Sequence, residues 1–97
     1  MRTILVINSK GGSGKTTVTT NLASYFAATG AKAAIMDYDP QGSSLQWLKL
    51  RPSHLPRIHG ANATPQKTLG LRSLQNWIPA DTDVLLIDPP GGVKGLL

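Results

Sequence analysis

A cluster of glycines, lysines and hydroxyl residues near the start of the chain has the spacing of a phosphate-binding loop. The run Lys10-Gly11-Gly12-Ser13-Gly14-Lys15-Thr16 follows an apolar stretch and leads into a helical pattern. Glycines let the backbone turn its N–H groups toward phosphate oxygens, and the following helix adds the positive end of its dipole. Lys15 can reach the outer phosphates, and the Thr16 hydroxyl can bind Mg²⁺. The alternative, a Gly-rich turn with two solvated lysines, does not account for the strand-to-helix context.

Two acidic motifs follow later apolar stretches. The first is Asp37-Tyr38-Asp39-Pro40-Gln41-Gly42, and the second is Asp88-Pro89-Pro90-Gly91-Gly92. In open parallel sheets, ligands bind at the carboxyl ends of strands, where carboxylates can hold Mg²⁺ and orient an attacking water. The simpler alternatives are an Asp-Pro turn with a helix cap at Asp39, and a strand that ends in a turn at Asp88. Together with the glycine loop, these motifs predict one phosphoryl-transfer site with water as the nucleophile.

The elements that must position these motifs are predicted from apolar runs and periodicity. Continuous apolar runs predict three parallel strands, over residues 3–8, 33–36 and 84–87. Helices are predicted over residues 15–29, 43–50 and, more weakly, 71–77, and residues 52–66 are expected to form a loop. In the first helix, the spacing of Val18, Leu22, Tyr25 and Phe26 predicts that they share one face. Alternating strands and helices predict an α/β fold of the P-loop NTPase type, a parallel sheet with helices on both faces.

Composition limits the class of protein. Ninety-seven residues suit one domain at most, and the absence of cysteine excludes disulfides and thiolate metal sites. No apolar run approaches the length of a membrane span and no signal peptide is recognisable, so we expect a cytoplasmic protein without a membrane partner. Ten Lys and Arg residues face five Asp and no Glu, which gives a net charge of +5. This balance favours anionic partners such as nucleotides, nucleic acids or acidic proteins.

Other side chains carry weaker signals. His54 and His59 are expected to be surface histidines rather than metal ligands, and Trp47 and Trp77 to pack in a core or interface rather than stack on bases. Five basic residues lie between the two acidic motifs, and they form either a solvated face or a surface that meets DNA or a partner protein. These five residues are Lys49, Arg51, Arg57, Lys67 and Arg72.

The motifs resemble those of the ParA/MinD superfamily of ATPases. The form K-G-G-x-G-K-T at residues 10–16 is similar to its deviant Walker A loop, with Ser9 where the general loop has glycine. Residues 37–42 resemble the switch I motif D-x-D-P-Q-G of ParA proteins. Asp88 ends a general Walker B strand, and residues 88–91 resemble switch II. The small ParA subgroup, which lacks an N-terminal DNA-binding domain, is the most similar.

The resemblance implies the roles of individual residues. In that family the first lysine of the loop, here Lys10, crosses to the nucleotide of a partner subunit. The catalytic residues would be Lys10, Lys15 and Asp39, with Asp39 orienting the hydrolytic water. ATP would be held by Lys10, Gly11, Gly12, Ser13, Gly14, Lys15, Thr16 and Thr17. Mg²⁺ would be held by Thr16, Asp37 and Asp88.

The resemblance also implies partners and a biological role. Such proteins form ATP-dependent homodimers, bind DNA non-specifically, and are stimulated to hydrolyse ATP by a ParB-like partner protein. They act in plasmid or chromosome partitioning. Family members continue beyond switch II, so we expect residues 1–97 to be a partial ATPase domain of the CobQ/CbiA/ParA nucleotide-binding type, the N-terminal half of the full fold. The alternative is a truncated, non-catalytic remnant that acts as a phosphate-binding or protein-interaction module.

Overall fold

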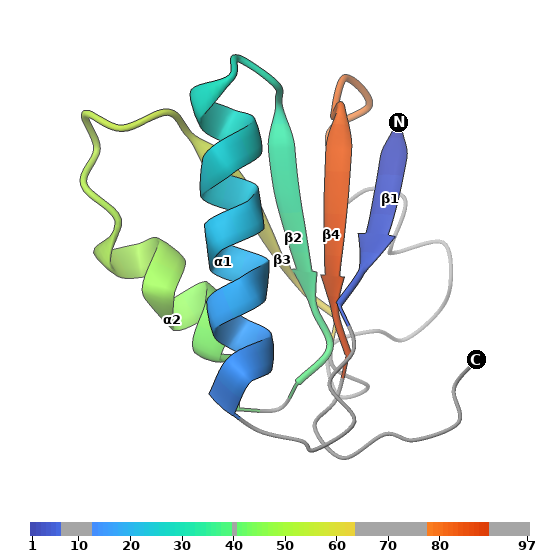
Figure 1. The fold of residues 1–97 in the computed structure, drawn as a ribbon, viewed down its shortest axis with the longest axis vertical. Coiled ribbons are helices and arrows are strands. Elements are labelled where there is room, and N and C mark those ends of the chain that lie inside the picture. Colours follow the sequence, from blue (N-terminus) through green and yellow to red (C-terminus); the bar gives the residue numbers. More distant parts are fainter. Residues whose placement is uncertain (7–12, 40, 64–77, 90–97) are drawn as a thin grey trace.

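The computed structural model describes residues 1–6, 13–39, 41–63 and 78–89. Figure 1 shows a twisted sheet with the described helices packed against it. In chain order the elements are β1 (Arg2–Leu5), α1 (Ser13–Ala28), β2 (Ala33–Asp37), α2 (Ser43–Leu50), β3 (Ile58–Asn62) and β4 (Val84–Asp88). None of the described helices is long and apolar enough to cross a membrane.

The strands pair in the order β1-β4-β2-β3, and every pairing is parallel. The strand that comes last in the described chain therefore lies in the centre, between β1 and β2. In this register Asp37, the last residue of β2, is aligned with Asp88, the last residue of β4. The predicted parallel α/β fold is confirmed, and its topology brings two of the three predicted motifs side by side.

The expectation of a loop over residues 52–66, and of three strands only, was wrong. Residues Ile58–Asn62 form β3, which pairs with β2 along its whole length. The segment contains a glycine and an asparagine, both poor strand formers, and only Ile58 and Ala61 in it are buried. Its strand conformation is imposed by pairing with β2, whose five residues are all buried, so no local apolar run marks it in the sequence.

The four residues predicted to share one face of α1 differ in their burial, and small residues form the face that meets the sheet. Val18 and Tyr25 are 48% and 63% exposed, whereas Thr19, Ala23 and Ala27 are almost fully buried. Small side chains let the helix lie close to the sheet, and the larger Leu22 and Phe26 pack at the margin of the core. The helix was correctly predicted, but the inward face is the one with small residues rather than the one with bulky residues.

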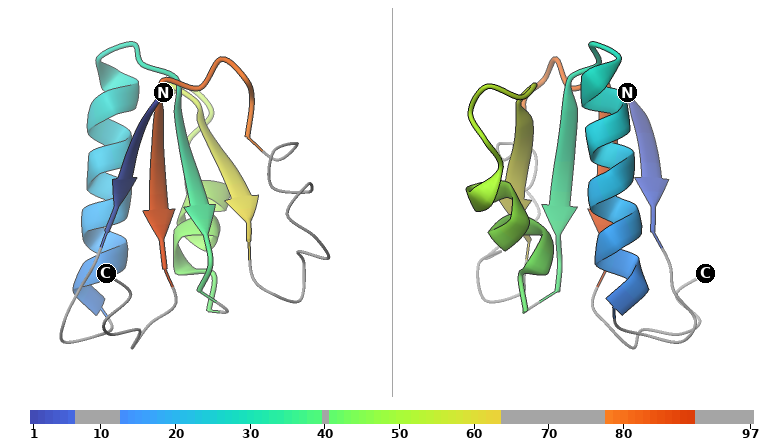
Figure 2. Two further views of the ribbon diagram at one scale, coloured as in Figure 1. Left: turned by 90° about the vertical axis from the view of Figure 1, so that its right-hand side faces the viewer. Right: turned by 60° about the vertical axis from the view of Figure 1, so that its left-hand side comes forward.

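Both described helices cover the same face of the sheet, as the two views in Figure 2 show. The main core lies between this face and the helices and includes Ile35, Ile58 and Leu86, with Trp47 packed against it. A second group of buried side chains, which includes Ala34, Met36 and Leu85, lies on the opposite face. The helix expected over residues 71–77, together with Trp77, falls outside the described residues.

Candidate functional site

Asp37 and Asp88 form the centre of the candidate site. They end adjacent strands in register, and their exposed fractions are 0% and 1%. The first turn of α1 lies at this same carboxyl edge of the sheet (Figure 1). Two carboxyl groups buried side by side are costly unless hydrogen bonds or a cation compensate for the lost hydration. The two buried carboxyl groups lie at the carboxyl ends of the strands, which is where ligands bind in open parallel sheets.

Hydrogen bonds compensate only partly for the hydration that the Asp37 carboxyl group loses on burial. Its Oδ1 accepts a hydrogen bond from the Asp39 backbone N–H at 2.9 Å, while its buried Oδ2 has no hydrogen-bond partner among the described residues. Burial is the main cause that raises the pKa of Asp37 above its usual value, and the nearby charges of Asp88 and Asp39 raise it further. The backbone N–H groups of Asp39 and Leu45 act in the opposite direction. The group is therefore placed where a bound cation would stabilise its ionised form.

Asp88 is held by two other parts of the site. The Ser44 hydroxyl in the first turn of α2 donates a hydrogen bond to Asp88 Oδ2, and both side chains are buried. The backbone carbonyl of Asp88 accepts a hydrogen bond from the Tyr38 N–H at 2.9 Å. The residues after β2 thus bind both the side chain and the backbone of the residue that ends β4.

Asp39 lies in a tight turn between β2 and α2. Its Oδ1 accepts the Gln41 N–H at 3.0 Å, and its backbone carbonyl accepts the Gly42 N–H at 2.9 Å. Gly42 has a positive φ of 64°, a conformation that favours glycine, and is itself the N-cap of α2. The turn proposed as the simple alternative is present, but the helix cap at Asp39 is not.

The donor set fits Mg²⁺ bound together with a nucleotide. Asp37 Oδ2, which is buried and has no hydrogen-bond partner among the described residues, and the adjacent Asp88 carboxylate are oxygen ligands of the kind that a hard cation prefers. Within the described residues, no group of three or more His, Cys, Asp or Glu side chains could enclose a metal ion. Mg²⁺ in phosphate sites commonly uses one or two carboxylates plus phosphate oxygens and waters. The site therefore fits a metal that arrives with phosphates better than a metal held by protein alone.

The glycine loop is described only in its second half. Lys10, Gly11 and Gly12 fall outside the described residues, and α1 begins at Ser13. Gly14, Lys15, Thr16 and Thr17 therefore lie in the first turns of α1, with Thr16 half-buried and Thr17 exposed. The Thr16 carbonyl accepts a hydrogen bond from Thr20 Oγ1 at 3.0 Å. A helix that begins within the loop is what the phosphate-binding motif requires.

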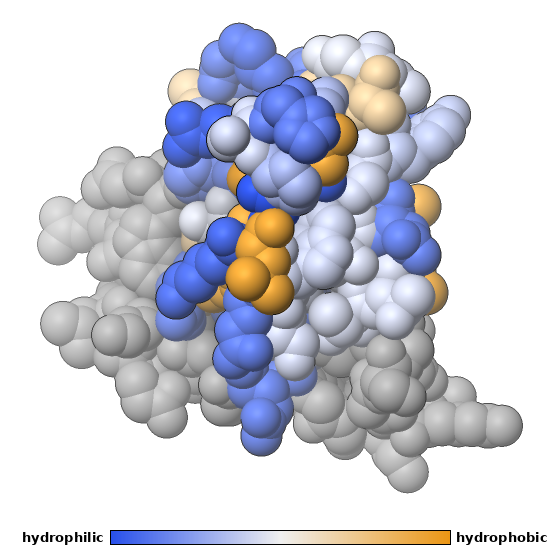
Figure 3. All heavy atoms as spheres, turned by 90° about the vertical axis from the view of Figure 1, so that its left-hand side faces the viewer, coloured by the Kyte–Doolittle hydropathy of each residue, from blue (hydrophilic) through white to orange (hydrophobic). Residues whose placement is uncertain are grey.

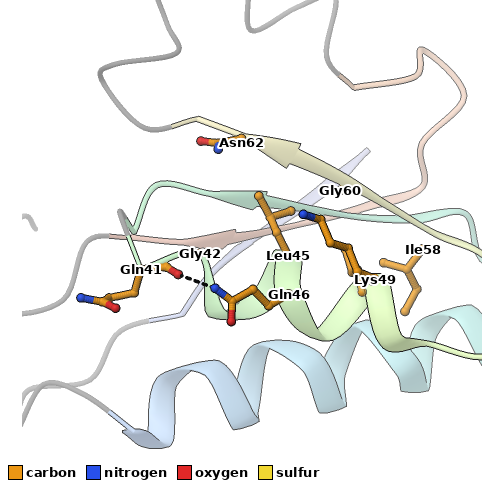
Figure 4. Close-up of a pocket in the computed structure, with 9 residues that line it drawn as sticks. Gln41, Gly42, Leu45, Gln46, Lys49, Ile58, Gly60 and Asn62 are labelled. Carbon is orange, nitrogen blue, oxygen red and sulfur yellow. Dashed lines mark hydrogen bonds between the residues drawn. The ribbon is translucent and has the colours of Figure 1, made fainter.

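A groove adjoins the site between α2 and β3 (Figure 4). Its volume is about 610 Å³, and it begins at Gln41 and Gly42 in the turn after Asp39. Gly60 forms part of its floor, where α2 approaches so closely that a Cβ atom would lie 2.7 Å from Leu48 Cδ1. The lining includes none of Asp37, Asp39 or Asp88, so the groove is separate from the carboxylate pair. Sequence reasoning missed it because β3 was not predicted.

The other predicted side chains lie away from this edge. Arg51 donates hydrogen bonds from Nε and Nη2 to the Pro56 carbonyl and from Nη1 to Ser24 Oγ, and lies over the Trp47 ring. Lys49 and Arg57 are exposed, as is His54, whereas His59 is half-buried on β3. Lys67 and Arg72 are outside the described residues.

The surface on the α2 side is mixed in character. In Figure 3, hydrophobic groups on this side are small and surrounded by hydrophilic atoms. The large hydrophobic side chains exposed among the described residues include Leu50 at the end of α2, Leu55 in the loop that follows, and Val18 and Tyr25 on α1. Arg51 binds α2 to α1 and to the loop after α2, so this basic side chain is already engaged within the fold.

A parallel α/β sheet with buried carboxylates at its carboxyl edge, beside a helix that begins in a glycine-rich loop, defines a nucleotide-binding domain of the P-loop type. The chain belongs to the family described as the CobQ/CobB/MinD/ParA nucleotide binding domain, which matches residues 4–80. The resemblance drawn from the motifs is therefore confirmed at the level of the family.

Several curated proteins are similar to this chain. It is 45% identical over 49 residues to the chromosome-partitioning ATPase Soj of Treponema pallidum, and 45% identical over 51 residues to that of Thermus thermophilus. These matches cover 50% and 53% of this chain but only 19% and 20% of the two Soj proteins. The chain is also 48% identical over 89 residues to the maintenance of carboxysome distribution protein A of Gloeobacter kilaueensis, covering 92% of this chain and 38% of that protein. The chain thus spans well under half the length of each of these relatives.

Proposed function

We propose that this chain forms the Mg²⁺-ATP-binding part of a ParA-type partition ATPase, which hydrolyses ATP and acts in plasmid or chromosome partitioning. The observation that carries the proposal is the buried pair Asp37 and Asp88, aligned at the carboxyl edge of adjacent strands beside the start of α1. Support for partitioning comes from the similarity to the two chromosome-partitioning Soj proteins.

The proposed roles follow from the chemistry of each side chain. Residues 10–17 bind the phosphates of ATP through backbone N–H groups, and Lys15 neutralises the outer phosphates. Thr16, Asp37 and Asp88 hold Mg²⁺, whose charge offsets the negative charge of the phosphates when it is bound. Asp39, fixed by its turn, orients the water that attacks the outer phosphate. Positioning and charge stabilisation account for most of such catalysis.

We also propose that the active form is an ATP-dependent homodimer in which Lys10 reaches the nucleotide of the other subunit. The dimer would bind DNA non-specifically, and a ParB-like protein would stimulate hydrolysis. The net charge of +5 supports contact with an anionic polymer. The cytoplasm, with access to the nucleoid, is the proposed location.

The test of the ATPase proposal is turnover of Mg²⁺-ATP by the full chain, with and without DNA. We expect turnover in the wild type and its loss in Lys15→Ala. Turnover that survives Lys15→Ala would contradict the assigned site. A wild-type chain that binds no nucleotide would favour a non-catalytic interaction module.

The dimer is tested separately by sedimentation with ATP and with ADP. We expect ATP to promote a dimer of the wild type, and Lys10→Ala to remain monomeric while it still binds ATP. Equal dimerisation of Lys10→Ala and the wild type would count against a contact between Lys10 and the nucleotide of the other subunit.

A further inference from the structure

The contact between Ser44 and Asp88 joins two parts of the chain that are 44 residues apart. Ser44 is 0% exposed and Asp88 is 1% exposed, and the serine hydroxyl donates to Asp88 Oδ2. A serine hydroxyl has a single proton to donate. In this structure that proton is directed to a candidate metal ligand, away from solvent.

The position of Ser44 in α2 makes this contact informative. Serine near the start of a helix commonly caps a backbone N–H. Here the N-cap is Gly42, which has no side chain to act as a cap, and Ser44 is the second residue of the helix. Alanine would fill the same space and favour the helix more strongly, so packing alone does not account for a buried serine at this position.

The two buried carboxylates differ in how they are held. Asp88 Oδ2 has the Ser44 hydroxyl, whereas Asp37 Oδ2 has no hydrogen-bond partner among the described residues. In metal sites, a hydrogen bond to a ligating side chain fixes its orientation and tunes its affinity for the metal. The hydroxyl is placed to do this for Asp88.

Ser44 also connects Asp88 to the turn that contains Asp39. The hydrogen bonds from the Gln41 and Gly42 N–H groups to Asp39 fix the chain just before α2. Since α2 begins at Ser43, a change in this turn would move the Ser44 hydroxyl relative to Asp88. The contact therefore couples the segment proposed to orient water with a carboxylate proposed to hold the metal.

We infer that Ser44 is a positioning residue for Asp88, whose hydroxyl holds the carboxylate in the orientation that binds Mg²⁺; this inference rests on the proposed function. It is tested by measuring ATP binding to the full chain as the Mg²⁺ concentration is raised, and again in EDTA. Ser44→Ala should raise the Mg²⁺ concentration at half-saturation about tenfold and leave ATP binding in EDTA unchanged. Ser43→Ala, which changes the exposed neighbouring serine, should behave as the wild type.

A second readout needs neither metal nor nucleotide. In EDTA, the effects of Ser44→Ala and Asp88→Ala on the midpoint of thermal unfolding should be non-additive, because each removes one partner of the same hydrogen bond. Additive effects would overturn the inference even if the wild type binds Mg²⁺-ATP.

The remaining outcomes separate the inference from the proposed function. Either of two results for Ser44→Ala would overturn the positioning role alone. One is a Mg²⁺ concentration at half-saturation equal to that of the wild type. The other is a loss of ATP binding that is as large in EDTA as it is with Mg²⁺. If Ser44→Ala does not fold, Ser44→Cys, which keeps a weaker donor, decides the question: an intermediate half-saturation supports the role and a wild-type value overturns it. A wild type that binds no ATP in Mg²⁺ would contradict the proposed function, and this inference with it.

Discussion

The two edges of the sheet carry aspartates in opposite environments. At the carboxyl edge, Asp37 and Asp88 are buried, and one carboxylate oxygen has no partner among the described residues. At the amino edge, Lys32 pairs with Asp81, and its backbone N–H donates to Asp83 Oδ2 at 2.8 Å. The Lys32 and Asp81 side chains remain 66% and 61% exposed.

Burial distinguishes the candidate binding site at the carboxyl edge from the surface ion pair at the amino edge. At the amino edge, water and a lysine stabilise the acids, so these charges need no further partner. At the carboxyl edge, burial raises the pKa of Asp37, and the adjacent Asp88 adds to that effect. Residues of the same type thus form a solvated ion pair at one edge and a buried pair, the proposed cation site, at the other. The predictions below test whether the two edges differ in function, in stability and in the response to pH.

The largest difference is expected between two lysines. Lys15→Ala should lower the rate of ATP hydrolysis by about a hundredfold or more, because the charge proposed to neutralise the outer phosphates is lost. Lys32→Ala, at the amino edge, should leave the rate unchanged. Steady-state hydrolysis at saturating Mg²⁺ measures both. Equal losses in the two variants would show that the edges are not distinct in function.

A smaller but opposite effect is expected for stability at the carboxyl edge. Asp37→Asn should raise the free energy of unfolding in EDTA by about 1 kcal/mol at neutral pH, because a buried and incompletely hydrogen-bonded charge is removed. The same variant should lose Mg²⁺-dependent ATP binding. Urea unfolding, together with nucleotide titration, checks both parts. A clear loss of stability would mean that the charged form of Asp37 supports the fold without metal.

The pH dependence should distinguish the edges by its sign. The pKa of Asp37 is raised above 3.8 in the folded state. As pH falls from neutral, Asp37 is therefore protonated in the folded state before it is protonated in the unfolded state, and the free-energy cost of burying its charge is removed. The advantage of Asp37→Asn over the wild type, measured in EDTA, should therefore shrink as pH falls toward 3.8. An advantage that grows over this range would contradict the direction of the shift.

The smallest effect is expected at Asp81. Its hydrogen bond and ion pair with Lys32 lower the pKa of Asp81, so its contribution is complete above pH 3.8 and is lost below it. Lys32 has a raised pKa for the same reason, so its contribution is lost only at alkaline pH, above 10.5. Asp81→Asn should thus lower the thermal midpoint only slightly, with no pH dependence near neutrality and less effect in high salt. A large loss of stability would show that the amino edge is more than a surface pair.

The sequence predicted those parts of the fold that local patterns specify. The strands over residues 33–36 and 84–87 and the helix over residues 43–50 are confirmed, because apolar runs and breakers mark them. β3 could not be predicted, since its conformation depends on pairing with β2. The inward face of α1 was not predicted, because close packing on the sheet selects small side chains, which the spacing of bulky residues does not mark.

The candidate site, like the fold, could be predicted only in part. The motifs predicted that Asp37 and Asp88 would lie at the same end of a parallel sheet. Their alignment depends also on β4 pairing directly with β2, which the motifs do not specify. Ser44 could not be identified, because its partner is distant in the sequence and nothing in the local motif marks its hydroxyl. The roles of Lys10, Lys15 and Asp39, and of Thr16, Asp37 and Asp88 as ligands of Mg²⁺, stay predictions.

The central claim is that Mg²⁺-ATP binds at the carboxyl edge of the sheet and not at the amino edge. Mn²⁺ can replace Mg²⁺ with ATP, and its paramagnetism broadens the NMR signals of nearby amides. The claim predicts that Mn²⁺-ATP selectively broadens the amide signals of Asp37, Asp39 and Asp88 and spares those of Lys32, Asp81 and Asp83. Broadening at the amino edge, or none at the carboxyl edge with ATP bound, would contradict it.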